Sequence, residues 1–521
     1  MKQVRPVQAA RLPNLAPRSL LLALAAMIAL TVALFGAANA QADTLRIGYA
    51  VTPLNTLDPH QANSMTEGNF MAMPLETLVR LDAEGAPIPH LAESWSLADD
   101  DVTWTFELRQ GVIFHDGTPF NAEAVKFTFE RLLDPETAAP ARGEFAVIEE
   151  VEVIDEHTVQ IRTREPHAPF ISTLAHYGSN IVSPAAVEAA ADGDFGSRPV
   201  GTGAFKVERF VPGDGSIDLV RNDDYWAEVP QVSRVTVRHF PEEAGATAAL
   251  LANEIDMIFR LPVTQVPVVE QVGGAEVLTA PAFTTMYLGF NTEREPFDNP
   301  EVRRALSHAV DVEAIHRDVL QDMAVMHPGP IGPSMFGFDE TLSGPEYNPE
   351  LARELLTEQG VEDLTIHYMV WEVGELVRMA ELLQDQLARV GVTLDIDVWE
   401  WTGFISATAE GSMDMFYLTW SNSTGDADIA LSSQFTCEQV GSRNRARYCS
   451  AEYDELAMSQ RTEMDPEARS GAISDALHHL VDDAPWVWLG SQMWVVGVRD
   501  SIHGFEIHPS GNFYITGVEK R

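Results

Sequence analysis

The most constraining feature of this sequence is residues 103–131 (TWTFELRQGVIFHDGTPFNAEAVKFTFER), which encode a strand, a turn and a capped helix in succession. Apolar and polar residues alternate over 103–109, which is the period of a half-buried strand. After the turn at 115–117, Asn121 is placed to cap a helix whose apolar face begins at Val125. The stretch therefore predicts a strand that a short turn connects to an amphipathic helix.

The same alternation of strands and helices recurs along the chain. Further strands are expected at 44–49, 236–240, 254–259, 285–291 and 392–399, with helices between several of them. This order is typical of layered α/β folds. A chain of 521 residues is also too long for one ordinary hydrophobic core, so two or more lobes are expected.

The N-terminus predicts export from the cytoplasm. An uncharged apolar run at 19–35 follows four basic residues, and the small residues at 38–42 offer cleavage after Ala40 or Ala42. We therefore interpret residues 1–42 as a cleaved secretory signal peptide. An uncleaved membrane anchor is the alternative. No cysteine follows the cleavage region, so we expect the mature protein to be free in the periplasm and not lipid-anchored.

The net charge argues against a nucleic-acid-binding function, and the two cysteines predict a disulfide and not a metal site. The formal net charge of −44 repels nucleic acid and anionic lipid, so no nucleic-acid partner is expected. The two cysteines, Cys437 and Cys449, are expected to form a local disulfide in an exported protein. A metal site would need more ligands at suitable spacing, and Arg443, Asn444, Arg445 and Arg447 between these cysteines supply none.

Signatures of catalysis are missing from the sequence. It contains no Gly-x-Ser-x-Gly elbow, no His-Glu-x-x-His and no phosphate-binding loop. His478, His479, Asp482 and Asp483 have helical spacing, but we interpret them as a solvated helix face. No catalytic residue, cofactor or metal is therefore expected, and a secreted hydrolase would lack a nucleophile and its base.

One loop has the composition of a ligand site. The predicted strand 414–419 leads into WSNSTGDAD at 420–428, where small hydroxyls, an amide and two carboxylates lie beside a tryptophan. Such groups suit a small polar zwitterion. A turn rich in Asx residues, or a helix cap with Trp420 in the core, explains the same residues. As a binding loop it would offer Trp420 as a stacking wall, Ser421, Ser423 and Thr424 as hydroxyl donors, and Asp426 and Asp428 as ammonium partners.

Longer stretches resemble a known family. LRQGVIFHDGTPFNAEAVKFTFERLLDP at 108–135, PVGTGAFKVERF at 199–210 and MYLGFNTEREPFDNPEVRRALSHAVD at 286–311 resemble the family 5, peptide-type solute-binding proteins of bacterial ABC importers. The resemblance covers essentially the whole mature chain. It implies a two-lobe α/β periplasmic binding fold of type II, cluster C-like, with an additional subdomain in lobe one and two interlobe crossovers.

The resemblance also implies domain boundaries. Lobe one is expected at 43–287 plus 489–521, with the additional subdomain at about 92–198, and lobe two at 288–488. The crossings are expected near Tyr287 and Leu489. Asn63 and Ser64 are then expected to reach the ligand from lobe one, with Trp401 as a second aromatic wall.

The loop at 420–428 bears on the ligand. In the dipeptide-binding branch of the family an aspartate holds the amino terminus of the peptide, and the matching position here is Ser423. The loop instead resembles the glutathione-binding branch, although Ile429 stands where a tryptophan is expected and the cysteine pair resembles the dipeptide branch.

These resemblances imply a monomeric periplasmic component of an ABC transporter. It would capture glutathione or a short peptide and deliver it to a permease with two ATPase subunits. A nickel complex, haem or an oligosaccharide stays open as ligand, as does a chemosensory or chaperone-like role.

Overall fold

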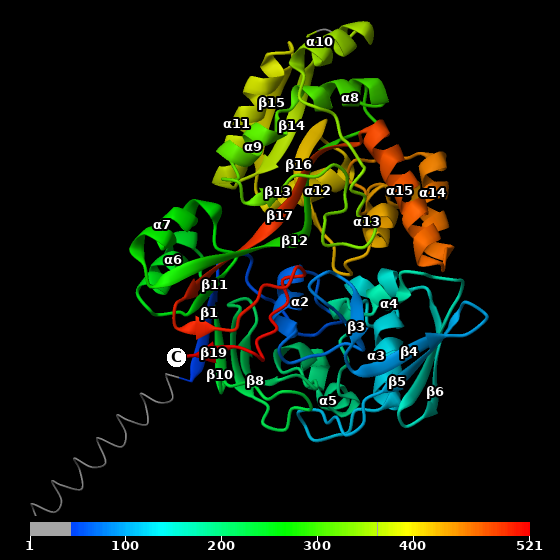
Figure 1. The fold of residues 1–521 in the computed structure, drawn as a ribbon, viewed down its shortest axis with the longest axis vertical. Coiled ribbons are helices and arrows are strands. Elements are labelled where there is room, and N and C mark those ends of the chain that lie inside the picture. The colour runs from blue at the N-terminus through cyan, green and yellow to red at the C-terminus, as the bar shows by residue number, and fades with distance from the viewer. Residues whose placement is uncertain (1–42, 362) are drawn as a thin grey trace, which may run out of the picture.

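The protein consists of two lobes that share one large sheet (Figure 1). The computed structural model describes residues 43–361 and 363–521, so the expected signal peptide lies outside the described residues. The sheet has the strand order β15-β14-β16-β12-β17-β11-β1-β10-β9-β8. Within the described ranges, no helix is both long and apolar enough to cross a membrane.

Lobe one is built on the half of the sheet that contains the first strand of the chain. Apolar side chains of its strands alternate into a buried core, as Leu45 and Ile47 do. Helices α6 and α7 lie beside its edge nearest lobe two (Figure 1). Its elements are β1 (Thr44–Tyr49), α2 (Met65–Met71), β2 (Val79–Leu81), β3 (Pro87–Pro89), α5 (Pro184–Ala189), β8 (Phe205–Val211), β9 (Ser216–Arg221), β10 (Arg234–His239), α6 (Glu243–Leu251), β11 (Met257–Phe259), α7 (Val266–Val272), β18 (Ile502–His503) and β19 (Glu519–Lys520).

A four-stranded antiparallel sheet forms a subdomain with a core of its own. It contains β4 (Ala92–Leu97), β5 (Thr103–Leu108), β6 (Ile148–Asp155) and β7 (Thr158–Thr163), with helices α3 (Ala122–Leu133) and α4 (Phe170–Thr173). The strand, turn and helix predicted from residues 103–131 are confirmed by β5 and α3. Asn121 caps α3, because its side chain accepts a hydrogen bond from the Ala124 amide at 3.1 Å.

Lobe two covers the other half of the sheet with helices. Its strands are β13 (Ala324–Val325), β14 (Thr365–Trp371), β15 (Thr393–Trp399) and β16 (Met415–Ser421). Its helices are α8 (Pro300–Ala309), α9 (Val312–Asp318), α10 (Pro349–Glu358), α11 (Gly374–Ala388), α12 (Trp401–Glu410), α13 (Ala427–Gln434), α14 (Ala451–Thr462) and α15 (Pro466–Asp483). The predicted disulfide between Cys437 and Cys449 is confirmed and follows α13.

Two long strands, β12 (Ala275–Phe290) and β17 (Trp486–Arg499), run from one lobe into the other. They pair with each other in both lobes, but their register shifts between Pro281 and Thr285. On one side of this break β17 pairs with β11, and on the other side β12 pairs with β16. The expected boundaries near Tyr287 and Leu489 fall in these strands on the lobe-two side of the break, and the domain limits stay predictions.

Gly490 makes the close contact that this crossing requires. Its φ is +87°, and a Cβ atom there would lie 2.1 Å from the carbonyl oxygen of Val325 in β13. Only glycine adopts this backbone conformation without strain, and only glycine leaves room for β13.

Replacing this glycine tests the crossing. Gly490→Ala should lower the free energy of unfolding by at least about 2 kcal/mol, because it adds both backbone strain and a clash with backbone. Urea denaturation of the mature protein measures the change. Gly471→Ala in α15 is the matched control, since nothing lies within 4 Å of its Cβ position. The control should be neutral or raise the stability by up to about 1 kcal/mol, as Ala suits a helix interior. Equal effects would contradict this account of Gly490.

Candidate functional site

The carboxyl ends of parallel strands from both lobes meet at one place. In lobe two, β14 pairs in parallel with β15 and β16, so the segments at 371–375, 399–401 and 420–424 follow strands at the same edge. In lobe one, β1 pairs in parallel with β10 and β11, so Ala50 and Arg260 also follow strand ends. Ligands of open α/β sheets bind outside such ends.

A cavity of about 510 Å³ lies at the ends of β1, β11 and β14, and the segments at 399–401 and 420–424 do not line it. We call it the hinge cavity. Lobe one lines it with 50–51, Glu243 and 260–264, and lobe two with Leu320, Met323, 372–375 and Arg378. The two crossing strands supply the rest, Met286 and 492–495. Its volume is in the range of small-molecule sites. Residues of both lobes and of the hinge therefore enclose one space.

Asn422 organises the loop at 420–428. Its side-chain oxygen accepts hydrogen bonds from the amides of Thr424 at 2.9 Å and Gly425 at 3.0 Å. Its side-chain nitrogen donates to the carbonyl of Asp426 at 2.7 Å. Asp426 in turn caps α13 by accepting from the Asp428 amide. The Asx turn and the helix cap that the sequence left open are therefore both present.

Gly425 brings this loop against lobe one. Its φ is +64°, and a Cβ atom there would lie 3.0 Å from the Leu81 side chain and 3.3 Å from the Gly85 carbonyl oxygen. Glycine allows this approach because it lacks a side chain. The loop is thus part of the contact between the lobes.

Both loop carboxylates already have arginine partners. Arg469 donates to the two oxygens of Asp426 at 2.8 and 2.6 Å, and this pair is buried. Arg461 donates to the two oxygens of Asp428 at 2.8 and 3.1 Å. A ligand ammonium would have to share either carboxylate with an arginine. The expected role of Asp426 and Asp428 as ammonium partners stays a prediction.

The other loop residues differ in how free they are. The hydroxyl of Ser421 lies 3.0 Å from that of Thr284, and the hydroxyl of Thr424 donates to Asn422. In the described part of the chain, the Ser423 side chain makes no hydrogen bond, and the enclosed indole nitrogen of Trp420 has no partner. Ser423 is therefore a loop residue whose side chain has no hydrogen bond to lose, whereas the Trp420 nitrogen is enclosed and its ring packs against buried residues.

The remaining predicted contacts, Trp401, Ser64 and Asn63, do not line the hinge cavity. Trp401 is 50% exposed, and its ring is edge-on to that of Trp371 at 5.2 Å between centroids. Ser64 caps α2 in a reciprocal arrangement with Glu67, and the Asn63 amide also donates to that carboxylate. These contacts give Ser64 and Asn63 structural roles, and their contact with ligand stays a prediction.

The segment at 372–375 and Arg260 line the hinge cavity although neither was predicted from the sequence. Both directly follow strands, β14 and β11, and that position was the signal that could have indicated them. Which strand ends face one another depends on the order of strands in the sheet, which the sequence did not give.

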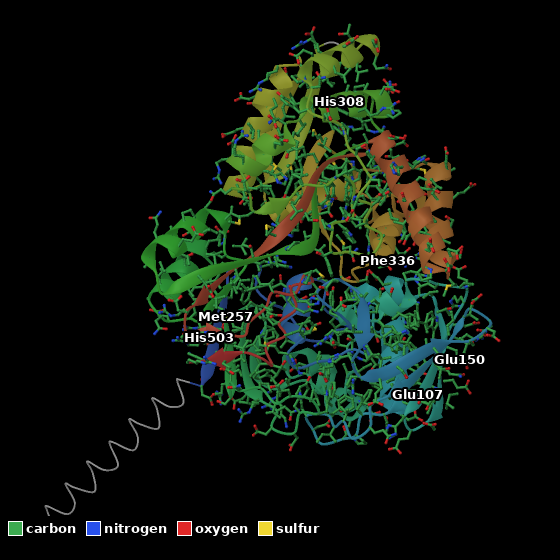
Figure 2. All side chains as sticks on the ribbon, viewed as in Figure 1. Glu107, Glu150, Met257, His308, Phe336 and His503 are labelled. Carbon is green, nitrogen blue, oxygen red and sulfur yellow. A yellow bond between two sulfur atoms is a disulfide. The ribbon has the colours of Figure 1, made fainter. Side chains whose placement is uncertain are left out.

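The lobes also touch where the subdomain faces α13, α14 and α15. The amide of Ala168 donates to the carbonyl of Arg461 at 2.7 Å, and Glu144 pairs with Arg443. Figure 2 shows Phe336 at this boundary, where it lines a second, largely apolar cavity of about 400 Å³. The guanidinium of Arg469 lies 5.0 Å from the centre of its ring. The interlobe contact thus extends across both sides of the hinge.

The Asp426–Arg469 pair is expected to stabilise lobe two. Arg469→Met should lower the free energy of unfolding by about 3 kcal/mol, because it leaves a buried carboxylate without its partner. Urea denaturation measures the loss. Arg162→Met is the control, because Arg162 forms an exposed pair with Glu149 whose loss should cost less than about 1 kcal/mol. A loss no larger than that of the control would show that Asp426 does not depend on Arg469.

Comparison with known proteins gives a consistent result. The model of a family described as bacterial extracellular solute-binding proteins, family 5 middle, matches residues 86–442. The chain is 31% identical over 512 residues to di/tripeptide-binding protein 2 of Pseudomonas aeruginosa, covering 93% of this chain and 96% of the relative. It is 30% identical over 498 residues to the glutathione-binding protein GsiB of Salmonella typhimurium, with the same coverage of 93% and 96%.

A solved structure agrees with these relatives. The dipeptide binding protein of Pseudoalteromonas sp. SM9913 in complex with Met-Leu superposes with a TM-score of 0.80 at 25% identity, covering 92% of this chain and 100% of that chain. The shared sheet, the two lobes and the matched sequence lead to one conclusion. This chain belongs to the bacterial extracellular solute-binding proteins of family 5, which are periplasmic binding proteins and not enzymes.

Proposed function

We propose that this protein captures a peptide-like solute, glutathione or a short peptide, between its lobes and delivers it to an ABC permease driven by ATPase subunits. The observation that carries the proposal is the hinge cavity, which the strand ends of both lobes enclose. Relatives named for di/tripeptides and for glutathione match the chain almost equally well, at 31% and 30% identity. The family likeness therefore supports the class of ligand without choosing between the two.

The loop at 420–428 favours a ligand other than an ordinary α-peptide. Ser423 stands where the resemblance places the aspartate that holds a peptide's amino terminus, and its hydroxyl has no partner in the described part of the chain. A hydroxyl can accept from an ammonium or donate to a carboxylate, but it carries no charge. Glutathione, which carries its amino group on a γ-linked glutamate, fits this change.

Binding would act through closure and would break no covalent bond. A ligand that contacts both lobes favours the closed arrangement by the difference between its affinities for the two states. The contacts of Ala168 with Arg461 and of Gly425 with Leu81 then join the lobes next to the loop. The closed form presents the ligand to the permease. We propose that the mature protein, residues 43–521, is a monomer that is free in the periplasm after cleavage of its signal peptide.

A thermal-shift screen tests the ligand class. Mature protein is incubated with reduced glutathione, oxidised glutathione, dipeptides and tripeptides. A ligand at one hundred times its dissociation constant stabilises the folded state by about 2.7 kcal/mol, which shifts the midpoint by a few degrees. We expect glutathione to give the largest shift. A shift with none of these compounds would overturn the proposal of a peptide-like ligand.

Exchanging Ser423 tests the reading of the loop. Ser423→Asp should raise the affinity for a dipeptide such as Ala-Ala relative to glutathione by about tenfold or more, because it adds a carboxylate for the peptide ammonium. Isothermal titration calorimetry measures both affinities. Ser423→Asn is the control, since the asparagine side chain has the shape of aspartate without its charge. An unchanged preference in both variants would remove Ser423 from the ligand contacts.

A further inference from the structure

Arg260 is a cation in the hinge cavity that no carboxylate neutralises. Its residue follows β11 and is partly exposed to the cavity. Its Nε atom is enclosed without a hydrogen-bond partner, and within residues 43–361 and 363–521 no ion pair involves it. Burial lowers the pKa of its guanidinium to about 10, so the group is still charged at neutral pH. Such a group is costly to bury unless it meets an anion.

Three other buried or half-buried arginines, Arg131, Arg303 and Arg469, have hydrogen-bond partners. Arg131 donates to both oxygens of Asp58 at 2.9 and 2.6 Å, and Arg469 pairs with Asp426 in the same manner. Arg303 donates to the backbone carbonyls of Phe297 and Asp483. Arg260 has no such partner among the described residues, and it lines the hinge cavity.

The backbone and two rings hold Arg260 in place. Its φ is +59°, a region that residues other than glycine rarely adopt and that costs about 1 kcal/mol or more. Its guanidinium carbon lies 4.8 Å from the ring centre of Trp494 and 5.6 Å from that of Phe259. Aromatic faces orient a cation and leave its N–H groups free to donate. The side chain is thus positioned without being neutralised.

Three glutamates and a second arginine, Arg378, also line the cavity. Glu372 and Glu375 line it from lobe two, and Glu243 lines it from lobe one. Burial raises the pKa of Glu375, the nearby Arg378 opposes this rise, and the carboxylate of Glu243 across the cleft adds to it. Two carboxylates from different lobes therefore repel each other when no cation lies between them.

We propose that Arg260 binds the C-terminal carboxylate of a zwitterionic ligand, which in glutathione is that of the glycine, and that the ligand ammonium lies toward Glu243 and Glu375, because Ser423 offers it no charge. The inference deepens the proposed function, on which it rests. A guanidinium can donate two parallel hydrogen bonds to a carboxylate, which is a geometry that a lysine or a hydroxyl does not reproduce. The ammonium would offset the repulsion between the two glutamates and so favour the closed lobes.

The test compares acids with amides. Calorimetry measures the affinities of wild type, Arg260→Met and Arg209→Met for glutathione, for Ala-Ala and for their C-terminal amides. In wild type, amidation should weaken binding by about tenfold to a hundredfold. In Arg260→Met the acids should bind as weakly as the amides, with less than about a twofold difference. Arg209 is exposed on β8, far from the cavity lining, so Arg209→Met should keep the preference of the wild type.

The unliganded protein gives an independent readout. If the charge of Arg260 is compensated only when a ligand carboxylate binds, Arg260→Met should unfold at the same temperature as wild type or higher, because the substitution removes a poorly compensated charge. A midpoint several degrees lower would assign Arg260 to the fold and overturn the inference. A preference for acids that persists in Arg260→Met would also overturn it. If wild type binds none of the compounds, the proposed ligand class fails, and the unfolding temperatures alone decide the role of Arg260.

Discussion

The pairing of β12 with β17 is the interaction on which the rest of the structure depends. Each strand contributes to both lobes, so a single antiparallel ribbon carries every other element of the large sheet on one side or the other. The ribbon is weakest at its register break, where Pro281 has no N–H to donate and β12 changes its partners. We therefore expect bending at this break, next to Met286 and residues 492–495, which line the hinge cavity. Movement of the lobes and the shape of the binding space are coupled by construction.

Strand direction then decides which residues face this space. The ends of β1 and β11 in lobe one, and of β14, β15 and β16 in lobe two, deliver their following residues to the cleft. Most polar groups of the loop after β16 stabilise the loop itself, since Asn422 holds the turn and Asp426 caps a helix. Few of its polar side chains are therefore left to bind a ligand. The oppositely charged groups of the site lie instead at the strand ends around the hinge, with Arg260 on the wall from lobe one and Glu375 on the wall from lobe two.

Local patterns predicted much of this fold and little of this site. The structure of residues 103–131 could be predicted because the alternation, the turn and the cap of α3 each depend on residues only a few positions apart. The disulfide followed from compartment and spacing. The loop at 420–428 was found by composition, but two readings fitted it, since the same side chains serve a turn and a ligand. The only local signal for Arg260 was its position directly after a strand, because its lack of a partner within the described ranges depends on residues far away in sequence.

The net charge of the protein has a particular consequence for Arg260. A protein with a formal charge of −44 repels any anion that approaches within a Debye length of about 10 Å. A dipeptide zwitterion carries no net charge, and reduced glutathione, with two carboxylates and one ammonium, carries a single negative charge, so this repulsion is absent for the first and small for the second. Once the lobes exclude water, the separate charges of the ligand interact strongly with Arg260 and with the glutamates opposite. The surface would then repel solutes according to their net negative charge. The cavity would select among the remaining solutes by the positions of their charged groups.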